Sequence, residues 1–156
     1  MCKLGWILAL LLLVTSGGLA WTFLIRGEAV PASDGRMALR LPPGERDLVL
    51  GEMREFLSAV QRIVDGANRD DMKTVAEAAR KVGFAAQQSV PVSLMKKLPM
   101  EFKRLGLGTH KAFDQLAMDA RDFGDKGKTL EQLAELMQNC VACHAAYRID
   151  PTPPGN

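Results

Sequence analysis

The stretch that decides the fold class is residues 129–149, which read TLEQLAELMQNCVACHAAYRI. Apolar residues recur in it every three or four positions, which is the spacing of one face of an α-helix. The positions on this face are Leu133, Leu136, Met137, Cys140, His144 and Tyr147. Thr129 and Gln132 form a capping-box pattern, which predicts that the helix begins there. We therefore expect an amphipathic helix over residues 129–149, with cysteine and histidine side chains on its inward face.

Three segments upstream show the same periodicity, over residues 44–65, from about residue 70 onward, and over residues 100–123. Their apolar positions are Leu50, Met53, Leu57, Val60 and Val64; Val75, Ala78, Ala79 and Val82; and Phe102, Leu105, Thr109, Phe113, Leu116, Ala120 and Phe123. Gly66 is expected to cap the first helix, and Asp70 or Asp71 to begin the second. A connection with Pro91 and Pro99 follows the second helix, and a turn at residues 125–128 precedes the last. No long strand-like alternation is present, so the sequence predicts an all-α fold, an antiparallel four-helix bundle over residues 44–150.

An uncharged apolar segment precedes the predicted bundle. Residues 5–25 carry no charge and are flanked by Lys3 and Arg26. A helix of ~20 apolar residues can cross a bilayer, and Trp6 and Trp21 lie near the two ends, where indole rings favour the membrane interface. The alternative is a cleaved secretory signal with small residues at positions 18–20. Residues 1–26 are therefore interpreted as a membrane anchor or a signal peptide, and both predict that the rest of the chain is exported.

The remaining composition limits the possible functions. Residues 27–43 contain three prolines and two glycines and are interpreted as a linker, and residues 151–156 as a C-terminal tail. Lys and Arg number 20 against 18 Asp and Glu, which leaves a formal net charge of +2. The aromatic residues are six Phe, two Trp and one Tyr. So weak a positive charge and so few stacking side chains exclude nucleic acid as the expected partner.

The chemistry is carried by the motif Cys140-Val141-Ala142-Cys143-His144. Cys-x-x-Cys-His is the attachment pattern of c-type haem, in which two thiols add to the porphyrin vinyl groups and the histidine becomes an axial iron ligand. Attachment takes place outside the cytoplasm, which agrees with the expected export. A zinc site would need His110 as its fourth ligand, and the adjacent Cys143 and His144 make a tetrahedron awkward. A redox dithiol is the other alternative, but no βαβ pattern surrounds the pair. The motif predicts one covalently attached haem c.

The position of the motif is also informative, because the motif lies on the last of the four predicted helices. In this respect the chain resembles the class II c-type cytochromes, the family of cytochrome c′. The resemblance is carried by CVACHAAYR at residues 140–148 and RDLVLGEM at residues 46–53, and it extends over about residues 44–149. It implies an antiparallel four-helix bundle, often a homodimer, that holds one haem on its last helix.

The resemblance also implies which residue lies over the distal side of the haem. It places Leu50 there, and a side chain without a lone pair would leave the iron five-coordinate and open to small gases. Two residues contest this interpretation. Met53 lies one helical turn further along the same face, and a thioether is a competent ligand that raises the reduction potential. His110 could instead complete a bis-histidine site.

Two arginines are expected near the haem. Arg148 comes four residues after His144, which would place both on one helical face. The resemblance implies that Arg148 lies close to this histidine or to the haem propionates. Arg46 is a second candidate partner for a propionate, or else a solvated cation at a helix end.

Two functions follow, and neither is hydrolytic or group-transfer catalysis, so no catalytic residue is predicted. The first is a periplasmic electron carrier for a redox partner protein. Tethering to the inner membrane by an uncleaved N-terminal helix would favour it, because a tether raises the local concentration at a membrane partner. The alternative is a five-coordinate haem protein that binds nitric oxide or carbon monoxide for sequestration or sensing.

Overall fold

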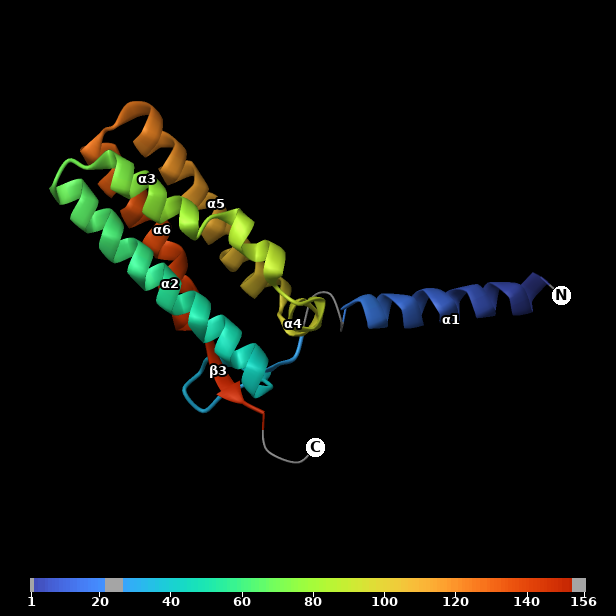
Figure 1. The fold of residues 1–156 in the computed structure, drawn as a ribbon. Coiled ribbons are helices and arrows are strands. Elements are labelled where there is room, and N and C mark those ends of the chain that lie inside the picture. Colours follow the sequence, from blue (N-terminus) through green and yellow to red (C-terminus); the bar gives the residue numbers. More distant parts are fainter. Residues whose placement is uncertain (1, 22–26, 153–156) are drawn as a thin grey trace.

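The computed structural model describes residues 2–21 and 27–152, and over these residues the chain is mostly helical (Figure 1). The helices are α1 (Cys2–Ala20), α2 (Pro43–Asn68), α3 (Met72–Lys81), the 3₁₀ helix η2 (Phe84–Ser89), α4 (Val92–Lys97), α5 (Met100–Phe123) and α6 (Lys126–Ala146). The strands are β1 (Ala29–Pro31), β2 (Met37–Leu41) and β3 (Tyr147–Pro151). The prediction of a mainly helical chain is therefore confirmed.

Four of the helices, α2, α3, α5 and α6, lie side by side. α3 packs between α2 and α5, and α5 packs against α6. The helix predicted over residues 100–123 is confirmed as α5. The connection with Pro91 and Pro99 is more ordered than expected, because η2 and the short α4 occupy it between α3 and α5.

A small sheet corrects the all-α prediction. β1 pairs antiparallel with β2, and β2 pairs parallel with β3, so the strand order is β1-β2-β3. In the parallel pair Met37 lies opposite Tyr147, and Leu39 lies opposite Ile149. Residues interpreted as a linker thus contain two strands, and the helix expected to reach residue 149 ends at Ala146. The cause is a pairing partner that lies at the far end of the chain, which local periodicity does not reveal.

Helix ends follow capping chemistry, at some positions other than those expected. The Asp71 side chain accepts a hydrogen bond from Thr74 N at 3.0 Å and begins α3, as predicted. Asp125 does the same for α6 through Lys128 N at 2.9 Å, so the predicted turn at residues 125–128 is wrong and Thr129 is buried within the helix. Gly66 is not a cap, because α2 continues to Asn68. A Cβ atom at Gly66 would lie only 3.0 Å from Val75 Cγ2, so this glycine lets α2 and α3 approach closely.

Two apolar cores hold these elements together. The first fills the space between the four long helices, with Phe56, Ile63, Phe113 and Leu116 among its largest members. The second lies where the sheet meets α2 and α4, and contains Ala29, Leu39, Leu41, Val49, Leu94 and Leu98. Because Met53 packs against both cores, they form one continuous interior.

The N-terminal helix α1 exposes large apolar side chains, among them Trp6, Leu8 and Leu13. Residues 22–25 of the apolar segment predicted at 5–25 lie outside the described residues. Within residues 2–21 and 27–152, no helix has the length and apolar character needed to cross a bilayer. The expected membrane span therefore gains no support from the structure.

Replacing Gly66 with alanine should lower the free energy of unfolding by about 1 to 3 kcal/mol, because the added methyl group overpacks the contact with Val75. Gly106→Ala in α5 is the matched control, since a Cβ atom there meets nothing within 4 Å. The control should raise stability by about 0.5 to 1 kcal/mol, since alanine is the better helix former. Chemical denaturation of both variants measures the difference. Equal effects of the two substitutions would contradict a close α2–α3 contact.

Candidate functional site

The predicted attachment motif lies on the last two turns of α6, just before the chain enters β3. Cys140 and Cys143 are half-buried free thiols, and His144 is exposed. Burial raises the pKa of both thiols, and a charge on Cys140 raises that of Cys143 further. Among the described residues, no side chain hydrogen-bonds the His144 ring, and no group of three or more His, Cys, Asp or Glu could hold a metal ion. The motif therefore supplies two thiols and one imidazole, but no metal cage made by the protein alone.

The flank of α6 that carries His144 faces α2. Gln132 of α6 hydrogen-bonds Asp119 of α5, so that side of α6 is turned toward α5. Leu130, Met137 and His144 are spaced by seven residues and lie on the opposite side, with Cys140 next to them. α6 also contacts α2, so this side meets α2.

The flank of α2 that faces α6 is also apolar. Glu55 of α2 pairs with Lys81 at the end of α3, with 2.6 Å between Oε2 and Nζ, so that side of α2 is turned toward α3. Leu50, Leu57 and Val64, again spaced by seven residues, lie on the other side, with Met53 between them and the core. The two predicted distal candidates on α2 thus share the flank that faces the motif helix.

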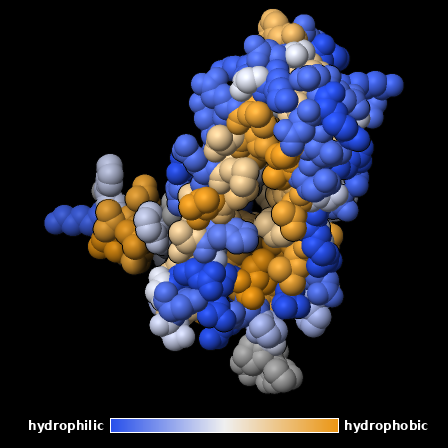
Figure 2. All heavy atoms as spheres, turned by 90° about the vertical axis from the view of Figure 1, so that its left-hand side faces the viewer, coloured by the Kyte–Doolittle hydropathy of each residue, from blue (hydrophilic) through white to orange (hydrophobic). Residues whose placement is uncertain are grey.

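The two flanks together form an apolar strip. Leu57 is 71% exposed, Met137 42% and Val141 69%, although none of them carries a polar group. Figure 2 shows apolar side chains gathered in a hollowed strip that runs along this face of the molecule. Exposed apolar surface that lines a hollow is typical of a ligand-binding groove. We refer to the strip between Leu50, Met53, Leu57 and Val64 of α2 and Leu130, Met137, Cys140 and His144 of α6 as the α2–α6 groove.

Arg46 adds a polar feature in the first turns of α2. Its Nε atom is buried and has no hydrogen-bond partner among the residues that the structure describes, and its ion pair with Asp47 is a loose 3.7 Å contact. A buried guanidinium nitrogen without an acceptor is costly and suits a site that receives an anionic group.

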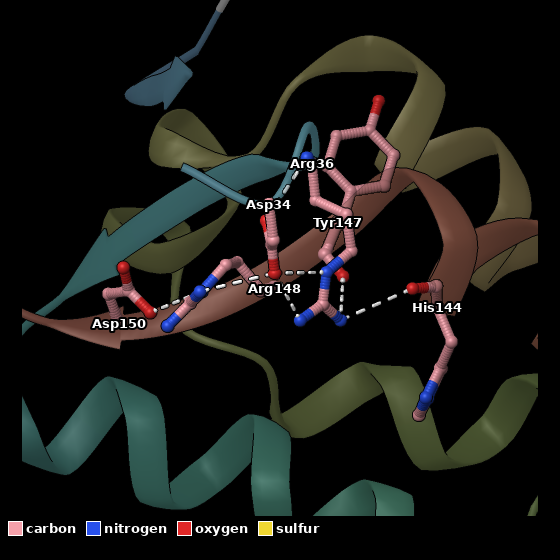
Figure 3. Close-up of polar contacts among 6 residues, drawn as sticks. All are labelled: Asp34, Arg36, His144, Tyr147, Arg148 and Asp150. Carbon is pink, nitrogen blue, oxygen red and sulfur yellow. Dashed lines mark hydrogen bonds and ion pairs between the residues drawn. The ribbon is translucent and has the colours of Figure 1, made fainter. Parts of the chain in front are cut away.

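Arg148 is not where the sequence predicted it. It belongs to β3 and not to α6, so the argument that it shares a helical face with His144 is wrong. Its Nε donates to Asp150 Oδ1 at 2.8 Å, and its Nη1 donates to Asp34 Oδ2 at 3.2 Å (Figure 3). Arg148 is therefore already paired with two carboxylates, Asp150 of β3 and Asp34.

His110 also differs from expectation. It is 1% exposed, and its Nδ1 lies 2.8 Å from the Val82 carbonyl oxygen, which can only accept, so Nδ1 carries a proton. Its Nε2 lies 2.6 Å from Gln87 Nε2 and 3.2 Å from Glu52 Oε1. Burial lowers the pKa of His110, but the bonds to Glu52 and to the backbone outweigh it and raise this pKa above its usual value. Both ring nitrogens are thus engaged on the Glu52 side of α2, away from the α2–α6 groove.

Sequence reasoning missed a charged cluster that holds the end of the motif helix. Arg36, between β1 and β2, donates from Nη1 to the backbone oxygens of His144 at 3.3 Å and Tyr147 at 3.5 Å. Its Nε and Nη2 donate hydrogen bonds to Asp34 Oδ2 at 2.9 and 2.7 Å, respectively. Figure 3 shows the His144 imidazole pointing away from this cluster. A cation on the last carbonyls of a helix is favourable, so Arg36 fixes the backbone of the motif and leaves the ring free.

The cluster predicts a pH-dependent contribution to stability. Hydrogen bonds from the Arg36 side chain and backbone, with the charges of Arg36 and Arg148, lower the pKa of Asp34 from 3.8 to about 2. Because the folded-state pKa is lowered, Asp34 stabilises the fold above its usual pKa, and this contribution is lost as the pH falls toward 2. Asp34→Asn should therefore destabilise the protein at pH 7 but not near pH 2.

Denaturant unfolding of both proteins across this pH range measures that difference. Asp47→Asn, which removes an exposed carboxylate from α2, controls for the loss of one negative charge. A destabilisation by Asp34→Asn that stays constant from pH 7 down to about pH 2 would rule out the ion-pair explanation.

Comparison with known proteins assigns no family to the chain. No protein-family description matches it, and neither does any curated protein or solved structure. The function must therefore be argued from the residues of the chain itself.

Proposed function

We propose that the chain is an exported mono-haem c-type cytochrome that transfers electrons. The observation that carries the proposal is the placement of Cys140, Cys143 and His144 on one end of α6, beside the apolar α2–α6 groove. When bound, a haem supplies a one-electron couple. The two half-buried thiols would hold it as thioethers, and the free His144 ring would be its axial ligand.

The groove residues fit such a group. Leu57, Met137 and Val141 offer the apolar surface that a porphyrin would cover and so shield from water. The unpartnered Arg46 Nε would find an acceptor in a propionate carboxylate. Arg148 is paired with Asp34 and Asp150, so a contact with a propionate would have to be shared with these carboxylates, and Arg46 is the better candidate. Arg36 would act through the backbone, by holding the carbonyl end of the helix that carries His144.

Export and assembly belong to the same proposal. The apolar N-terminal segment would direct the chain to the periplasm, where haem is attached, and would tether it to the inner membrane if it is retained. Covering the groove would leave other faces of the four long helices available for a homodimer or for a redox partner protein.

A second function, binding of nitric oxide or carbon monoxide, is favoured by the distal candidates. His110 has both ring nitrogens engaged and lies on the other side of α2, which argues against this residue as the sixth ligand. Leu50 faces the groove but has no lone pair to donate. Met53 is half-buried and packs against both cores, so its thioether would have to leave that packing to bind iron. An open sixth position would suit a small gas.

Replacement of Cys140 and Cys143 by alanine should abolish covalent haem attachment, because no thiol then remains on α6. The measurement is haem staining after denaturing electrophoresis of protein made together with a cytochrome c maturation system. Val141→Ala, between the two cysteines, is the matched control and should keep the stain. A stained band in the double variant, or no stain in the unaltered protein, would end the attachment proposal.

The distal side is tested by optical spectra of ferric and ferrous protein with and without carbon monoxide. Leu50→Met should convert a high-spin spectrum that responds to carbon monoxide into a low-spin one, because a thioether would be placed over the iron. Leu57→Met, two turns further along the same flank, is the control and should leave the spectrum unchanged. If the unaltered protein is already low-spin and indifferent to carbon monoxide, electron transfer stands and Met53→Leu should abolish that low-spin state.

A further inference from the structure

A cavity of about 620 Å³ lies on the side of α2 that is turned away from the α2–α6 groove. α2, η2, α4 and α5 supply most of its walls. Cys140, Cys143 and His144 do not line it, and neither do Leu50 and Met53. Its volume is within the range of small-molecule pockets, ~300 to 1,000 Å³. The cavity is therefore separate from the attachment site, and an inference about it does not depend on haem.

Most of the cavity wall is apolar. Phe56 of α2, Leu94 and Leu98 near α4, and Phe102 and Leu107 of α5 all line it. Water in such a space gains few hydrogen bonds, whereas an apolar molecule of matching size would remove this surface from water. The body of a ligand is therefore expected to be apolar.

Glu52, Gln87 and His110 form a polar group in this wall. Gln87 Nε2 donates to Glu52 Oε1 at 2.6 Å, and His110 Nε2 lies 3.2 Å from the same oxygen. The three side chains come from α2, η2 and α5, so the fold brings them together at one place in the cavity. The second carboxylate oxygen of Glu52 has no hydrogen-bond partner among the described residues and can accept a bond from a ligand.

The charges around the cavity restrict the kind of ligand that this polar group can bind. His110 Nε2 lies 3.2 Å from Glu52 Oε1, so the carboxylate already faces a group that can carry the opposite charge. The other charged side chains that line the cavity are two acidic and two basic, Asp47, Glu55, Lys81 and Lys103, and Lys81 is paired with Glu55, so together they add no net charge. A charged ligand would bring an unpaired charge into an apolar cavity, which is costly, whereas a hydroxyl group needs only one acceptor.

We propose that this cavity is a binding site for a neutral, mostly apolar small molecule with one hydroxyl group, which donates to the Glu52 carboxylate beside Gln87 and His110. Phenols and other hydroxylated ring compounds have this chemistry. The site lies in the same domain as the attachment motif but on the opposite flank of α2.

The test is isothermal titration calorimetry of the purified full chain with 2-naphthol and with naphthalene, which differ by one hydroxyl group. We expect one site for each compound, with 2-naphthol bound about fivefold more tightly, the effect of one hydrogen bond. Gly106→Leu should abolish binding of both compounds, because Gly106 lines the cavity and a Cβ atom there meets nothing within 4 Å. Leucine also favours the helix, so this variant should fold.

Two further variants separate the alternatives. Gly108→Ala, whose Cβ atom would meet only Asn139 of α6 at 3.9 Å, is the matched control in the same helix and should bind both compounds normally. Glu52→Leu should bind naphthalene as before but lose the preference for 2-naphthol. Equal binding by the unaltered and Gly106→Leu proteins would overturn the site. Equal affinity for the two compounds in the unaltered protein, or a preference that survives Glu52→Leu, would overturn the hydroxyl recognition. Circular dichroism melts verify that each variant is folded.

Discussion

The parallel pairing of β2 with β3 is the constraint on which the rest of the domain depends. Parallel neighbours need a long crossover, and here the crossover consists of the helices from α2 to α6. The pairing ties the segment before the first long helix to the segment after the last one. It also brings Arg36 to the carbonyl end of α6, so the strands and the cluster with Asp34 hold the backbone next to His144. A short sheet thus fixes the end of the helix that carries the Cys140–His144 motif.

α2 separates two sides of the domain. Its buried face, with Phe56 and Ile63, belongs to the core. One flank meets α6 and is apolar, and the other meets α3 and carries Glu52 and Glu55. His110 is buried among groups of the second flank. It therefore lies away from the apolar flank that faces α6. One helix can therefore support two sites that share no lining residue.

The sequence predicted the features that depend on residues close together in the chain. It missed the features that depend on residues far apart in the chain. The 3.6-residue period placed α5 at its observed bounds, and the carboxylate of Asp71 marked the start of α3. The strands were missed because β2 finds its partner only at the other end of the chain, and because Tyr147 continues the helical spacing of α6. The partners of His110 come from α2, η2 and the end of α3, so a lone histidine in the sequence gave no sign of them. The Cys140–His144 motif can be read from the sequence alone. The flank of α2 that faces this motif is known only from the fold.

The α2–α6 groove also has a consequence for the chain while this groove is uncovered. Leu57, Met137 and Val141 form a surface to which a second unfilled chain could adhere, since water favours any arrangement that covers it. Whatever covers the groove would therefore act on solubility as well as on stability, because binding to the folded state alone shifts the folding equilibrium by mass action. Chains produced faster than their groove is filled would be lost to aggregation. The supply of the covering group would then set how much soluble protein accumulates.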